Sequence, residues 1–237
     1  MKIRILSSCT GEKRYSPANK LTQVDFEQLH TTEFPIIEKR IEVYRTIAEE
    51  LYIGQQHLRL MEGVRHFRKI FGDESVELWI LSAGYGIIPG NKIIVPYECT
   101  FKGLQSANFR KWVYKLHIPN KAQEFFSKQS DVCFVLLGDL YLKALFLDAF
   151  TEFTSPTIFL ASKLSQKRIK GIGRLNVLPL SNKEAKQFSC GLIGLKGELC
   201  KRFLWLLTKH GNSIIDSFFE NNDIVLKLLK DCSLVQI

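Results

Sequence analysis

The feature that most constrains the fold of this chain is a continuous apolar run at residues 131–139, DVCFVLLGD, which ends in Gly138-Asp139. An unbroken apolar run bounded by turn residues is typical of a strand that is buried on both faces. Similar β-rich runs occupy residues 2–8, 76–86 and 157–162, and residues 172–180 supply one more candidate strand. Strands of this kind belong to parallel sheets that helices cover.

Amphipathic segments separate these strands. Apolar side chains recur at three- and four-residue spacing over 35–51 and 55–71, which predicts two helices broken near Gly54 and stopped at Gly72. We also expect an extended stretch over 92–101 and helices over 104–128 (broken near Pro119), 141–150, 182–209 and 212–231. Strands alternating with helices predict an α/β protein: a single domain over residues 1–237, with a largely parallel sheet flanked by helices and a helical C-terminal third.

Composition excludes several classes of protein. Hydrophobic residues make up 46% and charged residues 24% of the 237 residues, which is the balance of an ordinary globular protein and not of a disordered or fibrous one. No apolar run approaches the roughly 20 residues that span a bilayer. The opening segment has too short an apolar stretch for a secretory signal. We therefore expect a cytoplasmic protein without membrane contact.

The six cysteines and five histidines form no metal-binding pattern. Neither a CxxC pair nor an HExxH spacing occurs, so we expect free thiols and no metal site. The motifs GxxxxGK[ST] and GxGxxG are absent as well, which disfavours P-loop and classical dinucleotide-binding folds. The sequence identifies no cofactor, which therefore stays unknown.

Polar residues follow three of the predicted strands, and ligands of open α/β sheets bind beyond the carboxyl ends of the strands. We therefore expect these segments to form a pocket. The alternative is that Gly, Ser and Asp serve only turns and helix caps there. The candidate pocket residues are Ser7, Ser8, Cys9 and Thr10 after the first strand, Ser82, Gly84, Tyr85 and Gly86 after the second, and Gly138, Asp139 and Tyr141 after the third.

Two of these residues are candidates for chemistry. Cys9 follows a strand and has Lys13 and Arg14 nearby, and cationic neighbours favour the thiolate that a nucleophile needs. The alternative for Cys9 is a small residue that fills space at a strand end. Asp139 is a candidate acid or base, or equally the N-cap of the helix that follows it.

The charge of the chain favours phosphate-rich partners. Lys and Arg number 33 against 24 Asp and Glu, a formal net charge of +9. Residues 163–202 hold ten cations and two carboxylates, and this segment is the strongest candidate for nucleic-acid contact if its cations share a face. The alternative is an ordinary solvated surface. The cations that we assign to this role are Lys163, Lys167, Arg168, Lys170 and Arg174.

Two segments resemble the peroxide-stress YaaA family. LSAGYGIIPGNKIIVPYECTFKG (81–103) is similar to the family segment in which a Ser-x-x-Tyr-Gly turn precedes a Pro-Tyr pair, and GDLYLKAL (138–145) is similar to a later strand end of that family. The chain also resembles a group of uncharacterised bacterial domains with a Leu-Tyr-x-Gly step, which Leu51-Tyr52-Ile53-Gly54 matches. The positions that match the first segment are Ser82, Tyr85, Gly86, Pro96 and Tyr97.

The N-terminus resembles a third group. CTGEKRYS (9–16) is similar to the Cys-Ser-x-x-Lys-Pro-Tyr-Ser segment in the catalytic domain of archaeosine synthase. Cys9, Lys13, Tyr15 and Ser16 match, and Arg14 replaces the proline. That enzyme modifies a nitrile-bearing deazaguanine in tRNA, and YaaA-like proteins bind DNA and protect it under oxidative stress. The resemblances therefore imply nucleic acid, DNA or tRNA, or a nucleotide as the ligand.

The resemblances imply roles for individual residues. Cys9 would attack an electrophilic carbon of a modified base, with Lys13 stabilising the thiolate, and Ser82, the backbone of residues 84–86 and Asp139 lining the pocket. The leading hypothesis is thus an enzyme that acts on a nucleotide or a nucleic-acid base, as in deazaguanine modification.

Two alternatives remain open at this point. The first is a DNA-binding protein without turnover, in stress protection or genome defence, whose affinity depends on Lys167, Arg168 and Lys170. The second is a sensing subunit that holds a nucleotide signal and meets a protein partner through its helices at 182–209 and 212–231.

Overall fold

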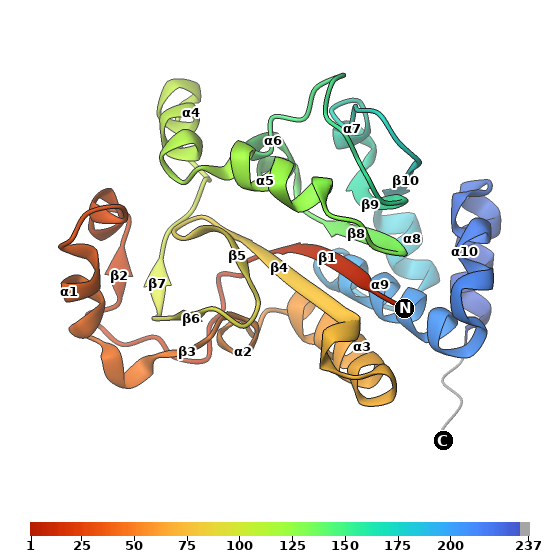
Figure 1. The fold of residues 1–237 in the computed structure, drawn as a ribbon, viewed down its shortest axis with the longest axis horizontal. Coiled ribbons are helices and arrows are strands. Elements are labelled where there is room, and N and C mark those ends of the chain that lie inside the picture. Colours follow the sequence, from red (N-terminus) through yellow and green to blue (C-terminus); the bar gives the residue numbers. More distant parts are fainter. Residues whose placement is uncertain (233–237) are drawn as a thin grey trace.

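The computed structural model describes residues 1–232, whose centre is a six-stranded sheet in the order β10-β9-β8-β1-β4-β5 (Figure 1). Its first five strands in this order run parallel, and β5 returns antiparallel beside β4. The strands are β1 (Ile3–Ser8), β4 (Val76–Ser82), β5 (Gly86–Pro89), β8 (Val132–Leu136), β9 (Thr157–Ser162) and β10 (Leu175–Leu180).

The path of the chain through the parallel strands changes direction once. The chain passes from β1 to β4 on one side, and then returns to β8, β9 and β10 on the other side of β1. The carboxyl ends of these parallel strands meet at one edge of the sheet. The switch point between β1 and β8 is the place where open sheets of this topology bind their ligands.

Helices cover both faces of the sheet, because right-handed crossovers that run in opposite directions lie on opposite faces. Figure 1 shows α3 and α9 on one side and α4, α5 and α6 on the other. Among residues 1–232, no helix combines the length and the apolar character needed to cross a bilayer. The helices are α1 (Phe34–Lys39), α2 (Ala48–Leu51), α3 (Gln55–Phe71), α4 (Ser106–Lys115), α5 (Ile118–Ser127), α6 (Asp139–Ala144), α7 (Lys163–Gln166), α8 (Asn182–Gln187), α9 (Leu192–His210) and α10 (Asn222–Asp231).

Pairs of short strands form a second layer of structure near the carboxyl edge of the sheet (Figure 1). β2 (Leu21–Thr22) pairs in parallel with β7 (Tyr97–Glu98), and β3 (Thr46–Ile47) pairs antiparallel with β6 (Ile93–Ile94). These pairings tie the segment after β1 to the segment after β5. The 3₁₀-helices are η1 (Asp25–Gln28), η2 (Glu42–Tyr44), η3 (Asp73–Ser75), η4 (Gly211–Ile214) and η5 (Asp216–Phe219).

The predicted α/β fold with a largely parallel sheet and a helical C-terminal part is confirmed. The helix that we expect over residues 35–51 is wrong, since α1 ends at Lys39 and β3 interrupts the pattern before α2. Pairing of β3 with β6 overrides the local helical spacing. The amides of Ala48 and Glu49 extend that pairing to the carbonyls of Lys92 and Gly90, both at 2.8 Å.

Three other predicted elements differ in extent. The helix over 141–150 is only α6, which begins at Asp139 and stops before Phe146, whose φ of 51° leaves the helical region. Residues 182–209 form α8 and α9, separated where Ser189 takes a φ of 51°. Residues 212–231 form two 3₁₀-helices before α10, and the stretch 92–101 holds only the two-residue strands β6 and β7.

Two glycines bring α3 and α9 into close contact beneath the sheet. A Cβ at Gly197 would meet the carbonyl oxygen of Gln56, and a Cβ at Gly63 would lie 2.7 Å from the Cα of Lys201. Beside this contact the buried carboxylate of Glu198 forms salt bridges with the guanidinium of Arg59 at 2.8 Å and with the ammonium of Lys201 at 2.7 Å. The two helices therefore approach this closely because glycine has no side chain at the contact. The salt bridge between Arg59 of α3 and Glu198 of α9 fixes how the helices are aligned along their axes.

We expect Gly197→Ala to lower the free energy of unfolding by about 1–3 kcal/mol, because the added methyl group must displace backbone atoms of α3. Gly191→Ala is the matched control, since a Cβ there meets nothing within 4 Å. Urea unfolding of both variants measures the effect. Equal stability of the two variants would contradict the close packing of α3 on α9.

Candidate functional site

A cavity of about 350 Å³ opens at the switch point, at the carboxyl ends of β1 and β8. Its walls come from the segment after β1, the segment around β7, and the first turn of α6. The residues that line it are Cys9, Thr10, Gly11, Lys13, Tyr15, Ser16, Lys20, Tyr97, Glu98, Cys99, Thr100 and Tyr141.

Cys9 lies at the centre of the sheet edge. Its amide continues the β1–β4 pairing with a 2.9 Å bond to the carbonyl of Leu81, and its side chain is only 8% exposed. The thiol sulfur lies 3.2 Å from the hydroxyl oxygen of Tyr141. Burial raises the pKa of Tyr141, with the nearby Cys9 adding to the effect, so this phenol stays protonated at neutral pH and is able to donate a hydrogen bond to the sulfur.

Lys13 supplies a cation to the same cavity. Its Nζ donates to the carbonyls of Thr10 at 3.2 Å and Gly11 at 3.5 Å, and it lies 4.5 Å from the ring centroid of Tyr97. Burial lowers the pKa of Lys13, while Cys9 opposes that shift. Lys13 is therefore a stronger proton donor than an exposed lysine, and it is placed beside a thiol.

Arg14 does not join Lys13 at the thiol. Its guanidinium pairs with Glu50 at 2.7 Å on the surface. The amide of Arg14 bonds the carbonyl of Leu51, so the chain turns this side chain away from the cavity. Of the two cations that we expect near Cys9, only Lys13 lines the site.

Tyr97 is fixed from behind by two hydroxyl groups. The Oγ of Ser82 lies 2.6 Å from the Tyr97 hydroxyl, and the hydroxyl of Tyr52 lies 2.8 Å from it. Burial raises the pKa of both Tyr52 and Tyr97, so the cluster is neutral at physiological pH. A rigid aromatic wall results, over which the Lys13 ammonium is held.

The turn after β4 supports this wall without lining the cavity. The Oγ of buried Ser82 accepts the amides of Gly84 at 3.0 Å and Tyr85 at 2.9 Å. A Cβ at Gly84 would lie 2.9 Å from the ring of Phe26, and Gly86 takes a φ of 71°. These residues position Tyr97, and no side chain of theirs reaches the cavity lining.

Two further members of the predicted set also have supporting contacts. The hydroxyl of Tyr85 donates to Glu38 at 2.8 Å and accepts the amide of Val95 at 3.3 Å. Pro96 is buried, and its carbonyl accepts the amide of Leu21 at 3.2 Å, which holds β2 beside β7. Both residues therefore hold the segment that carries Tyr97.

The other residues after β1 divide between the site and the scaffold. Ser7 is fully buried and accepts the side-chain amide of Gln56 at 3.2 Å. Ser8, the last residue of β1, is half-buried and is absent from the cavity lining. Thr10 lines the cavity, but its hydroxyl donates to the carbonyl of Glu12 at 2.7 Å and accepts the amide of Gly54 at 3.2 Å, which secures the start of α3.

Asp139 lies beside the cavity, not in its lining. Gly138 is the N-cap of α6, and Asp139 is its first residue. The carboxylate accepts the hydroxyls of Ser162 at 2.7 Å and Ser165 at 2.6 Å, which ties α6 to β9 and α7. Burial acts to raise the pKa of Asp139, but the serine hydrogen bonds, with Lys196 and Arg168 nearby, together lower it. The contacts of this carboxylate thus hold α6 in place against β9 and α7.

The predicted basic segment does not form one face. Lys163 is exposed on α7, and Lys167, Arg168 and Lys170 border one shallow hollow. Arg174 instead pairs with Asp216 at 2.6 Å. The remaining cations lie on the buried side of α9. Lys196 donates to the carbonyl of Leu137, and Lys201 and Arg202 both pair with Glu198.

Several site residues escaped the sequence analysis. Cys99 places a second thiol in the cavity, and burial raises its pKa to about 12. Outside the cavity lining, Lys196 donates to the carbonyl of Leu137 just after β8, and burial lowers its pKa to about 8. Neither residue belongs to a recognisable motif. Tyr52, which the sequence marks only as part of the Leu-Tyr-x-Gly step, contributes the second hydroxyl behind Tyr97.

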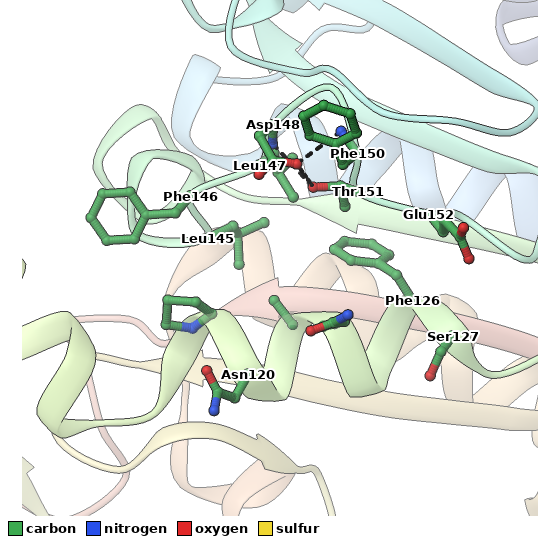
Figure 2. Close-up of a pocket in the computed structure, with 13 residues that line it drawn as sticks. Asn120, Phe126, Ser127, Leu145, Phe146, Leu147, Asp148, Phe150, Thr151 and Glu152 are labelled. Atoms are coloured by element: carbon green, nitrogen blue, oxygen red, sulfur yellow. Dashed lines mark hydrogen bonds between the residues drawn. The ribbon is translucent and has the colours of Figure 1, made fainter.

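A second hollow of about 460 Å³ lies between α5 and the loop after α6 (Figure 2). Figure 2 shows Asp148 closing a turn through its bonds to the amide of Phe150 and the hydroxyl of Thr151. No cysteine, histidine or lysine lines it, so it offers fewer reactive groups than the switch-point cavity. Residues 1–232 also contain no group of three His, Cys, Asp or Glu side chains that is arranged to hold a metal ion.

Comparison with known proteins gives a family match. The model of DUF6884, a family of unknown function, matches residues 38–169, which is more than half of the chain. The match spans Tyr52, Tyr97, Cys99 and Tyr141 of the site, and it begins after Cys9 and Lys13. A search of the curated proteins finds no match.

The buried ammonium of Lys196 predicts a pH dependence of stability. Its pKa is about 8 in the folded protein against 10.5 for an ordinary lysine. Between these two pH values the unfolded chain binds more protons, so stability rises with pH there, and below pH 8 the folded protein carries the full cost of burying the charge.

We therefore expect Lys196→Met to raise the free energy of unfolding at pH 7 by about 1–3 kcal/mol, and the gain to disappear near pH 10.5. Urea unfolding at several pH values measures it, with Lys69→Met on the exposed side of α3 as control. A gain of the same size at every pH would contradict the assignment.

Proposed function

Because the chain belongs to the DUF6884 family, whose function is unknown, we propose from the site itself that it is an enzyme acting on a nucleotide or on a base within nucleic acid, with Cys9 as its nucleophile. The observation that carries this proposal is the group formed by Cys9, Tyr141 and Lys13 at the switch point of the sheet. A thiol with a buried ammonium in the same cavity suits a cysteine nucleophile, because a nearby cation favours the thiolate, and the phenol adds a hydrogen-bond donor to the sulfur.

The cavity supports a base-sized ligand. A volume of about 350 Å³ is at the small end of ligand pockets, which suits a planar heterocycle better than a long chain. The rings of Tyr15, which is 36% exposed, and Tyr141 in the lining offer aromatic surface for contact with such a heterocycle. Lys13 provides positive charge at the same cavity for a phosphate or an electron-rich base edge, whereas Lys20 is paired with Glu98 of the lining at 3.0 Å.

In the proposed step, the Cys9 thiolate adds to an electrophilic carbon of a modified base, such as the nitrile carbon of a deazaguanine. A sulfur–carbon bond forms, one π bond of the nitrile breaks, and the nitrogen takes a proton from Lys13. The hydrogen bond from Tyr141 orients the sulfur before the attack. The product of this addition is a thioimidate. Water or an amine then adds to the same carbon, the sulfur–carbon bond breaks, and the Cys9 thiolate is released.

A second candidate function is nucleic-acid binding without turnover. The net charge of +9 and the exposed cations Lys167, Arg168 and Lys170 support it. It does not account for a thiol held against a phenol beneath a rigid aromatic wall, and for that reason the enzymatic proposal is preferred. We place the reaction in the cytoplasm, where the free thiols of this chain stay reduced.

The proposal predicts a covalent adduct on Cys9. After the protein is mixed with 7-cyano-7-deazaguanine, denaturing mass spectrometry should show one added base, located on the peptide that contains Cys9. Cys9→Ala should form no adduct, because Cys9 is the attacking group. Lys13→Met and Tyr141→Phe should slow its formation about 10- to 100-fold, since each removes a group that assists the proton transfer or orients the sulfur.

Cys190→Ala is the matched control, because Cys190 is a half-buried thiol outside the cavity. Native mass spectrometry of each variant verifies the folded state. An adduct that persists in Cys9→Ala, or no adduct in the unmodified protein, would contradict the proposal. Binding that is lost on denaturation would likewise indicate a pocket without covalent chemistry.

A further inference from the structure

Six cations lie on one surface, and only three of them belong to the basic segment that the sequence predicts to contact nucleic acid. Lys167, Arg168 and Lys170 border a hollow of about 510 Å³ after α7. A neighbouring hollow of about 520 Å³ is bordered by Arg110 and Lys111 of α4. Lys143 and Phe146 line both hollows, so the two form one continuous surface. We name it the basic–aromatic surface: Arg110, Lys111, Lys143, Lys167, Arg168 and Lys170 around Phe146.

The charges of this surface are available to a ligand. In the described part of the chain, no salt bridge involves any of its six cations, whereas Arg14, Arg59, Arg174 and Lys201 are all paired with carboxylates elsewhere. Asp148 is the acidic residue in the lining of the two hollows, and its Oδ1 accepts the amide of Phe150. A surface of this charge binds polyanions.

Aromatic rings are presented together with the charges. The ring of Phe146 stacks on that of Tyr114, with centroids 5.6 Å apart and planes at 14°, and the guanidinium of Arg110 lies 5.7 Å from the Phe146 ring centroid. Tyr114 is 54% exposed, and Phe150, in the same loop as Phe146, is 84% exposed. Phe146 takes a φ of 51°, a conformation that a bulky residue adopts only where its surroundings hold it.

An aromatic chain connects this surface with the cavity of Cys9. The Nζ of Lys143 lies 4.9 Å from the ring centroid of Phe109, which contacts Phe101 at 5.5 Å. Phe101 in turn contacts Tyr141 at 5.1 Å, and Tyr141 meets the Cys9 sulfur. Tyr141 and Lys143 are two residues apart on α6, so this one short helix serves both the cavity and the surface.

We infer that the basic–aromatic surface binds single-stranded nucleic acid and presents one of its bases to the Cys9 cavity. Free cations beside exposed aromatic rings are the combination that recognises single strands, since the cations follow the phosphates and unpaired bases stack on the rings. In a duplex those base faces are already stacked on one another. The inference rests on the proposed function, because it states the form in which the base reaches Cys9.

Fluorescence anisotropy with a labelled 20-nucleotide strand of mixed sequence tests the inference, with DNA, RNA and the matching DNA duplex as separate probes. We expect at least one single strand to bind more tightly than the duplex. Its affinity should fall as KCl is raised, with a log–log slope that reports the number of phosphate contacts.

Two variants separate charge from stacking. The triple variant Lys167→Ala, Arg168→Ala, Lys170→Ala should weaken binding at least about tenfold and reduce the slope by about 0.7 for each contact removed. Phe146→Leu should weaken binding about fivefold or more and leave the slope unchanged, because it removes a ring and no charge. The double variant Lys69→Ala, Lys227→Ala removes exposed cations of α3 and α10 and should bind as the unmodified protein does.

Equal binding by the triple variant and the Lys69/Lys227 control would overturn the inference, as would a duplex that binds as tightly as the single strands. The outcomes also separate the two proposals. A protein that forms the Cys9 adduct but binds no strand refutes the surface alone. A protein that binds single strands through these residues but forms no adduct refutes the proposed function alone.

Discussion

The rest of the structure depends on the parallel pairing of β1 with β4 on one side and β8 on the other. Ile3, Ile5 and Leu6 of β1 are completely buried, as a strand covered by helices on both faces must be. Because the three strands are parallel, the segments that follow them leave from the same edge of the sheet. Cys9 and Tyr141, 132 residues apart in the chain, meet there at 3.2 Å.

The pairing alone leaves the loops at that edge free, and buried hydroxyl groups fix them. Ser82 closes the turn after β4 and bonds Tyr97, which Tyr52 also bonds, so three separate segments share one hydroxyl cluster. The resulting wall holds Lys13 in place over the Tyr97 ring. The small pairings of β2 with β7 and β3 with β6 serve the same end, because they fasten the long segment after β1 to the segment that carries Tyr97 and Cys99.

The apolar runs of the sequence predict the five parallel strands β1, β4, β8, β9 and β10, but not the short antiparallel strand β5. The rule for strand ends predicts that the segments after β1 and β8 meet, and Cys9 and Tyr141 of these segments line one cavity together with Lys13. Helical spacing over 35–51 failed, since pairing between distant residues outweighed local preference. No local pattern shows that Arg14 and Arg174 form salt bridges, because their partners are distant in the chain. For the same reason the sequence does not show that Arg110 and Lys167 border the same surface.

The proposed reaction depends on Cys9 being the reactive thiol, and limited alkylation of the folded protein tests that claim most directly. Cys9 is only 8% exposed, whereas Cys99, Cys190 and Cys232 are more open to solvent. With substoichiometric iodoacetamide and peptide mass spectrometry, we predict that Cys9 is labelled first and that Lys13→Met slows its labelling. Labelling that simply follows exposure, with Cys9 among the slowest of the six, would contradict the account.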